Sequence, residues 1–164
     1  MKIKYINLIF CVFVAALLFV FIHYGCNNNY IHIHEYEKEF FGEETCEELK
    51  EKCTKNDKDI VQPILDTAEK AFSYLGDENL IENNFGILGK YSLASYKDVI
   101  SETHKIKFLT AKLDENSGYI WINYSQRGYD INGKIICGSR DINTRWSLEK
   151  IDNKWVVIKT KEAP

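Results

Sequence analysis

The sequence predicts an α+β fold in which one long helix packs on a curved, four-stranded antiparallel sheet. The final third of the chain, His104–Lys161, is rich in Ile, Val, Thr, Tyr and Trp, which favour strands. The stretch Ile60–Leu75 instead spaces its apolar residues by three and four positions, which is typical of one helix face. A helix followed by a run of strands is characteristic of the α+β class.

Three turn signals divide the strand region. The strongest is Asn132-Gly133, because an Asn–Gly pair takes positive φ at low cost and favours a two-residue hairpin turn. Asp152-Asn153 resembles it, although its second residue is not Gly, and the polar stretch 115–118 separates the first strand from the second. The strands flanking the two hairpins are Gly118–Ile131, Lys134–Ile151 and Lys154–Lys161.

Two-residue turns would fix the register of both hairpins. The first sets Tyr119 opposite Trp146, and the second sets Leu148 opposite Val157. Because side chains alternate between the faces of a sheet, most of the large residues then share one face, unless a bulge shifts the register by one and inverts the assignment. The predicted members of this face are Tyr119, Trp121, Asn123, Arg140, Ile142, Trp146, Leu148, Trp155 and Val157.

The long helix has recognisable ends. Asp57 or Asp59 is expected to precede it, Pro63 is tolerated in a first turn, and Gly76 ends it. Its apolar face is expected to lie across the sheet. The residues of that face are Val61, Ile64, Leu65, Ala68, Ala71, Phe72 and Leu75.

The first residues predict attachment to a membrane. Met1–Lys4 is basic and Ile6–Ile22 is continuously apolar, just long enough for a tilted transmembrane helix and slightly long for a secretory signal. In either case the positive charge before the apolar run places the remainder on the extracytoplasmic face of the cell membrane.

The stretch Gly25–Asn29 keeps a second form of attachment open. It resembles the start of a mature bacterial lipoprotein, with Cys26 as the lipidated residue, whereas His23 and Tyr24 depart from that pattern. The predicted organisation is therefore a transmembrane anchor or lipoprotein signal over 1–26, a charged juxtamembrane helical segment over 27–57 and a domain over 58–164.

The charge excludes nucleic acid as a partner. The formal net charge is −3, and residues 1–26 contain only basic charges, so the remainder is more acidic still. Only three of the 21 basic residues are arginine, namely Arg127, Arg140 and Arg145.

The chain ends on the motifs Trp146-Ser-Leu148, Asp152-Asn153, Trp155-Val-Val157 and Glu162-Ala-Pro164. This end is similar to the NTF2-like (cystatin-like cone) superfamily, whose last hairpin often reads Trp-x-Leu, a polar turn, Trp-x-Ile and an acidic-Pro close. The resemblance covers 59–164 and implies a sheet that wraps a helix around a conical pocket. Members include isomerases, dehydratases and cyclases as well as non-catalytic exported domains, so fold alone does not assign function.

A ligand pocket is predicted where aromatic walls meet a few polar groups. Its candidate residues are Trp121, Asn123, Arg140, Trp146 and Trp155. For Trp146 and Trp155 a place in the core is the favoured interpretation.

Other chemistry is weakly signalled. His104 has Asp98 and Glu102 nearby as possible dyad partners, but a polar residue opening a strand is favoured. His32 and His34 form only a partial metal set. No catalytic residue, metal site or cofactor is predicted.

The sequence therefore predicts a membrane-anchored extracytoplasmic domain that binds a ligand or a partner protein without catalysis. Two alternatives stay open. One is a small pocket enzyme of the isomerase, dehydratase or cyclase type. The other is a structural subunit of a membrane-spanning transfer or secretion assembly.

Overall fold

The computed structural model describes residues 48, 49 and 51–162, which all belong to the second of the chain's two units, Ile33–Pro164. The predictions for residues 1–26 and for Cys26, His32 and His34 lie outside these residues. Within 48, 49 and 51–162, no helix is both long and apolar enough to cross a membrane.

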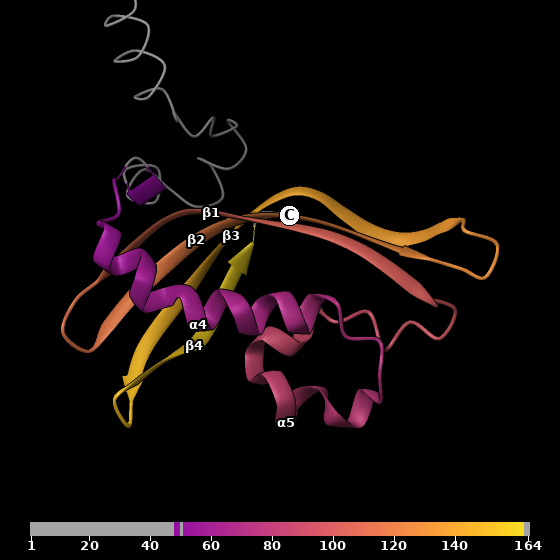
Figure 1. The fold of residues 1–164 in the computed structure, drawn as a ribbon, viewed down its shortest axis with the longest axis horizontal. Helices are drawn as coiled ribbons and strands as arrows, with labels where there is room; N and C mark the ends of the chain where they lie inside the picture. The colour runs from indigo at the N-terminus through magenta and orange to yellow at the C-terminus, as the bar shows by residue number, and fades with distance from the viewer. Residues whose placement is uncertain (1–47, 50, 163–164) are drawn as a thin grey trace, which may run out of the picture. The chain divides into compact units, whose positions relative to one another are not determined.

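The described residues form an α+β fold with a four-stranded antiparallel sheet, as predicted, and the sheet is open (Figure 1). The strands follow one another in chain order across the sheet, so each pairs with its neighbour in sequence. The helical elements are α4 (Lys55–Phe72), η1 (Glu78–Leu80), α5 (Ile81–Phe85) and η2 (Gly86–Tyr91). The strands are β1 (Ser101–Leu113), β2 (Ser117–Tyr129), β3 (Ile135–Ile151) and β4 (Lys154–Glu162).

Helix α4 begins earlier than expected. Thr54 caps it in a reciprocal capping box with Asp57, so two free backbone amides are satisfied at its start. The prediction that placed Pro63 in the first turn was wrong, because Pro63 lies inside α4. The helix also ends before the predicted Gly76, with Ser73 as its C-cap.

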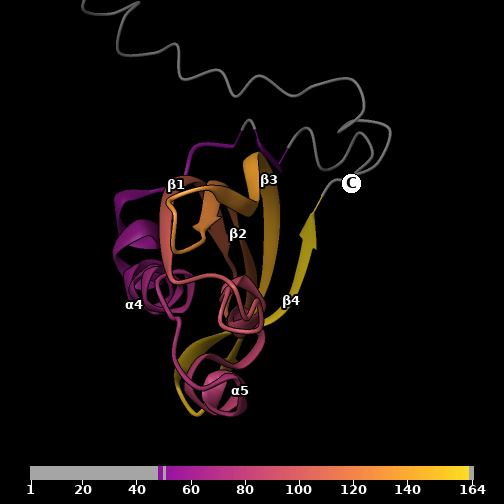
Figure 2. The ribbon, with the colours of Figure 1, turned by 90° about the vertical axis from the view of Figure 1, so that its right-hand side faces the viewer.

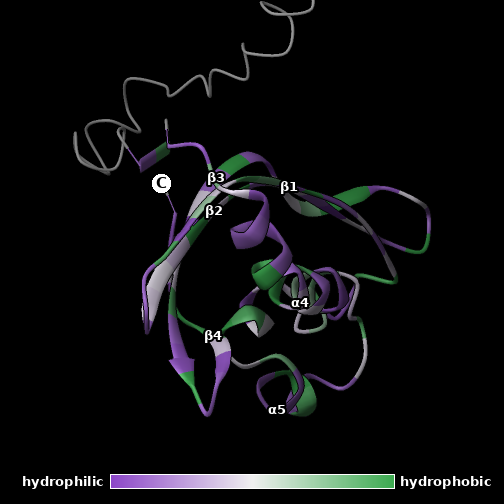
Figure 3. Cartoon of the chain, turned by 60° about the vertical axis from the view of Figure 1, so that its left-hand side comes forward, coloured by the Kyte–Doolittle hydropathy of each residue, from purple (hydrophilic) through white to green (hydrophobic). Residues whose placement is uncertain are grey.

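The apolar stripe of α4 packs on one face of the sheet, here called the helix side. The sheet curves around α4, which lies along that face (Figures 2 and 3). The buried residues of α4 are Val61, Ile64, Leu65, Ala68, Ala71 and Phe72. They meet a cluster that includes Ala111, Ile120, Ile122, Tyr124, Trp146 and Leu148.

A bulge corrects the predicted facing of β2. Over Gln126–Gly128 the expected pairing holds, with Arg127 opposite Gly138. One extra residue then enters β3 at Asp141, where φ is 53°. Every pair farther from the hairpin, from Tyr124 with Ile142 onward, is therefore shifted by one residue. Trp121 consequently faces Arg145 instead of Thr144.

The two hairpins differ in how their turns form. The β3–β4 turn has the predicted two residues, Asp152 and Asn153, both at positive φ, and Leu148 pairs with Val157 as expected. The β2–β3 connection is longer than the predicted two-residue turn: Tyr129 pairs with Ile135. The prediction of a two-residue turn was therefore wrong for this hairpin.

The face of the sheet opposite α4 is here called the outer face. By register it carries the alternate residues of β1 and β2 together with Arg145 of β3. Its members on β1 and β2 are Thr103, Lys105, Lys107, Thr110, Lys112, Tyr119, Trp121, Asn123, Ser125 and Arg127.

Candidate functional site

Aromatic rings fill the helix side at the place where the resemblance implied a pocket. Phe72 of α4 stacks on Tyr91 with ring centroids 4.7 Å apart, and Tyr124 stands edge-on to both. Trp146 lies 5.6 Å from Tyr91 and is fully buried. The four rings and the aliphatic residues around them form a packed core.

The polar groups among these rings bond to one another. The Trp146 indole donates to the Tyr91 hydroxyl at 2.8 Å, and that hydroxyl lies 3.3 Å from the Thr144 hydroxyl. The Gln126 amide donates to the backbone carbonyls of Phe72 and Tyr91. Burial raises the pKa of Tyr91 well above its usual range, so this phenol stays neutral and acts as a structural hydrogen-bonding group. The sequence offered no signal for this network.

Glu162 closes one side of the helix-side core. Its carboxylate pairs with Lys90 at 2.9 Å and accepts a hydrogen bond from the Tyr124 hydroxyl at 3.3 Å. Burial and the charge of Glu162 raise the pKa of Tyr124 to about 12. The contact joins η2 to the end of β4, which is an edge strand.

His104 lies between two carboxylates. Its Nε2 is 2.6 Å from Glu69 on α4 and its Nδ1 is 3.0 Å from Glu102 on β1. Glu102 was one of the two predicted partners. Because both ring nitrogens are engaged, the imidazole has no free lone pair for a substrate, and the arrangement favours a structural link between α4 and β1.

The pH dependence of stability should reveal this link. Burial lowers the pKa of His104, but the hydrogen bonds that its ring donates to the Glu69 and Glu102 carboxylates outweigh burial and raise the pKa overall. The protonated ring therefore stabilises the fold below its unfolded pKa of about 6.5, and this contribution is lost as pH rises through the folded pKa. We expect His104→Gln to flatten the decline of the free energy of unfolding with rising pH. The change should be at most about 1 kcal/mol, because Glu69 is half exposed. An unchanged pH profile in denaturant titrations of the full chain would contradict the link.

The outer face holds carboxylates of the chain's own upstream segment. Arg145 binds Glu48 through two nitrogens, at 2.7 and 3.0 Å, and the Trp121 indole donates to the same carboxylate at 3.1 Å. Glu51 accepts from the Tyr119 hydroxyl at 2.6 Å and pairs with Lys112 at 3.2 Å. We call these four sheet residues together with Glu48 and Glu51 the carboxylate clamp, with Thr110 as a further contact through its hydroxyl to the Glu51 carbonyl.

Farther along β2, the outer face carries an open hollow of about 280 Å³. By register, its side-chain walls come from alternate residues of β1 and β2, while residues whose side chains face α4 contribute backbone to its floor. Gly138 pairs with Arg127 and has no side chain, and a Cβ there would lie 2.3 Å from a backbone carbonyl oxygen. The hollow is lined by Thr103, His104, Lys105, Ser125, Gln126, Arg127, Ser139 and Arg140.

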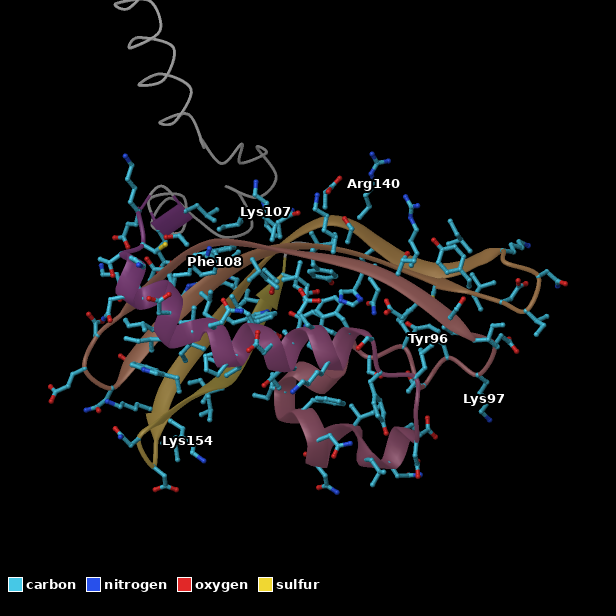
Figure 4. All side chains as sticks on the ribbon, in the orientation of Figure 1. Tyr96, Lys97, Lys107, Phe108, Arg140 and Lys154 are labelled. Carbon is cyan, nitrogen blue, oxygen red and sulfur yellow. The ribbon has the colours of Figure 1, made fainter. Side chains whose placement is uncertain are left out.

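The basic groups of the hollow are exposed. Lys105 and Arg127 form no ion pair with a carboxylate of the described residues, while Arg140 lies 3.3 Å from Asp141 in a largely solvated pair. Figure 4 shows Arg140 and Lys107 on the side of the sheet away from α4. Three positive charges and the hydroxyl groups of Thr103 and Ser125 favour an anionic group here, whereas the Ser139 hydroxyl bonds to Tyr124 on the helix side.

The five residues predicted as pocket walls do not share a face. Trp146 is buried on the helix side, and Trp155 packs against the same core. Trp121 lies on the outer face in the clamp, and Asn123 donates to Asn143 at 2.9 Å. Arg140 alone of the five lines the hollow. The predicted facing was wrong because of the bulge at Asp141.

Metal-binding groups are not assembled in the part of the chain that the structure describes: no set of three His, Cys, Asp or Glu side chains is placed to hold an ion. Cys53 and Cys137 are free thiols in the same part.

Comparisons with known proteins give neighbours in structure only. No family model matches the chain, and no curated protein matches it in sequence. The intermembrane space region of the chloroplast protein ARC6 has a TM-score of 0.42 and 10% identity, covering 63% of this chain and 93% of its own. The association domain of CaMKII from C. elegans also has a TM-score of 0.42, with 12% identity over 66% of this chain and 95% of its own. A variant of Rd1NTF2_05 has a TM-score of 0.36 and 15% identity over 66% and 99%.

Proposed function

We propose that this chain is a membrane-anchored, extracytoplasmic domain of the NTF2-like type that binds a partner protein without catalysis. The arrangement of α4 on a curved antiparallel meander supports the NTF2-like assignment. The apolar run Ile6–Ile22 after a basic start supports the anchor and the extracytoplasmic location.

The filled helix side is the observation that carries the non-catalytic assignment. Phe72, Tyr91, Tyr124 and Trp146 occupy the region that a pocket enzyme would keep open for substrate. The hydroxyl and indole groups there bond to each other. The exposed basic groups lie instead on the outer face, and large apolar residues are exposed near the β2–β3 hairpin.

Site-specific photocrosslinking in intact cells tests this proposal. A photoreactive residue at Lys107 on the outer face, at Ile131 in the hairpin turn or at Gln62 on α4 samples three exposed positions. We expect a discrete protein adduct from Lys107 or Ile131 and none from Gln62. Adducts of equal strength from all three positions, or a small molecule that co-purifies and changes the fluorescence of Trp146, would contradict a partner-binding role.

The membrane assignment needs its own experiment. Cys26→Ala should abolish lipid labelling if Cys26 carries the anchor, whereas unchanged membrane retention would favour a single transmembrane span. Lys154 is exposed in the β3–β4 hairpin, so a membrane-impermeant amine reagent added to intact cells should label it. Failure of the reagent to label Lys154 would contradict an extracytoplasmic domain in either case.

A structural subunit of a membrane-spanning assembly is the second candidate, because large apolar residues are exposed near the β2–β3 hairpin. Ile131 is 78% exposed, an unusual position for isoleucine unless another surface covers it. The other large apolar residues that are exposed in this part of the described chain are Tyr96, Ile100, Ile135 and Ile136. An adduct confined to Ile131 would favour this candidate.

A further inference from the structure

We infer that the hollow on the outer face binds an acidic segment of the partner protein, with Lys105, Arg127 and Arg140 holding its carboxylates. This inference rests on the proposed function and names the chemistry of the partner. It depends on charge complementarity, on hydroxyl groups at the hollow, and on an instance of carboxylate binding next to it.

The carboxylate clamp shows that this face recognises acidic side chains. Glu48 has its two oxygens bound by one arginine in the bidentate geometry that makes Arg–carboxylate pairs strong. Glu51 has a phenol and a lysine as partners. Both carboxylates reach the sheet from outside it, as those of a docked peptide would.

The hollow offers similar basic and hydroxyl groups: Arg140 and Ser125 contact the neighbouring Asp141 carboxylate at 3.3 and 3.4 Å, while Lys105 and Arg127 form no ion pair among the described residues. Its floor and walls continue the line of β2, since Trp121 of the clamp and Ser125 of the hollow are four residues apart on one face, about 13 Å. Arg140 keeps most of its surface in solvent despite its contact with Asp141. Lys105 and Arg127 come from neighbouring strands.

An extended acidic segment fits this arrangement better than a single small anion does. The basic groups come from three adjacent strands and do not converge on one point among buried donors. Side chains on one face of an extended chain recur at about 6.6 Å, the same repeat that separates Ser125 from Arg127. Glutamates at alternate positions could therefore meet successive basic groups.

Binding of a defined peptide to the detergent-solubilised full chain tests this inference. The probe is a fluorescein-labelled peptide of alternating glutamate and serine, followed by anisotropy, with a glutamine-for-glutamate peptide as control. Replacing Lys105, Arg127 and Arg140 together with glutamine should weaken binding by about tenfold, because three exposed ion pairs are lost. The matched control is Lys97→Gln with Lys154→Gln, since both lysines are exposed away from the hollow (Figure 4).

The outcomes separate the inference from its competitors. Weaker binding by the hollow variant, unchanged binding by the control variant and loss of binding at high salt would support it. Equal binding of the glutamine peptide, equal loss in both variants, or binding only to vesicles containing anionic phosphatidylglycerol would overturn it. Binding that appears only after Glu35–Glu47 is neutralised would assign the hollow to the chain's own segment and would also overturn it. A crosslink from Ile131 alone would overturn this site while still showing that the chain contacts a protein partner, so failure of the site and failure of partner binding are distinguishable.

Discussion

Replacing Trp146 with alanine should lower the free energy of unfolding by about 3–5 kcal/mol, the range for large aromatic residues removed from a packed core. Trp146 is fully buried, contacts the Tyr91 ring and donates its indole hydrogen to the Tyr91 hydroxyl. The substitution would open a cavity and also remove that hydrogen bond. Denaturant titration of the full chain in detergent measures the loss.

Trp155 supplies the matched control for this experiment. It packs against the same core but remains partly exposed, so Trp155→Ala should cost clearly less than Trp146→Ala. Equal losses would mean that Trp146 is not the centre of the core. A Trp146→Ala chain of unchanged stability that loses a bound small molecule would restore the ligand pocket predicted from the sequence.

Arg145→Ala should lower the free energy of unfolding by about 1–3 kcal/mol, because the substitution leaves the Glu48 carboxylate beside the sheet without its bidentate partner. The value is set below that of a deeply buried pair, since the Arg145 and Glu48 side chains keep 27% and 18% of their surface in water. The guanidinium also lies over the Tyr119 ring at 4.7 Å, and this contact would be lost too.

A double-mutant cycle separates these contributions. Glu48→Gln removes the charge and keeps the shape, so the pair Arg145→Ala and Glu48→Gln should lose less than the sum of the single variants. Lys112→Ala is the control, because its pair with Glu51 is about half exposed and should contribute less than about 1 kcal/mol. Additive losses in the cycle would show that the clamp does not couple the upstream segment to the sheet.

The clamp ties the start of the described chain to the outer face of the sheet. Glu48 and Glu51 reach the outer face, whereas α4, which packs on the helix side, starts at Lys55. The chain therefore contacts both faces of the sheet within a few residues. Arg145→Ala should therefore loosen the attachment of Glu48 to the outer face.

Local patterns in the sequence were enough to predict the elements. The spacing from Val61 to Phe72 predicted the buried face of α4, and β-branched and aromatic runs predicted the four strands. Asp152-Asn153 also predicted the last hairpin and its register, because a two-residue turn leaves no freedom in pairing.

The assignment of faces depended on a single residue that no local pattern marked. Asp141 has an ordinary sequence neighbourhood, yet its positive φ inserts one residue into β3 and moves Trp121 from the expected face to the opposite one. Because the sequence did not reveal this bulge, the pocket residues were predicted to share one face, and the structure separates them. The position of a bulge is set by the packing of both strands. The sequence alone could therefore only indicate that a bulge, if present, would invert the predicted assignment of faces.

Composition and periodicity thus determined the fold class, the helix, the strands and the last turn, because each depends on neighbours a few residues away. The tertiary structure decided the chemistry: His104 met Glu69 from 35 residues upstream, Arg145 met Glu48 across 97 residues, and four distant rings closed the helix side. Contacts between such distant residues form only when the whole sheet takes its register, and one bulge was sufficient to change which side chains could meet.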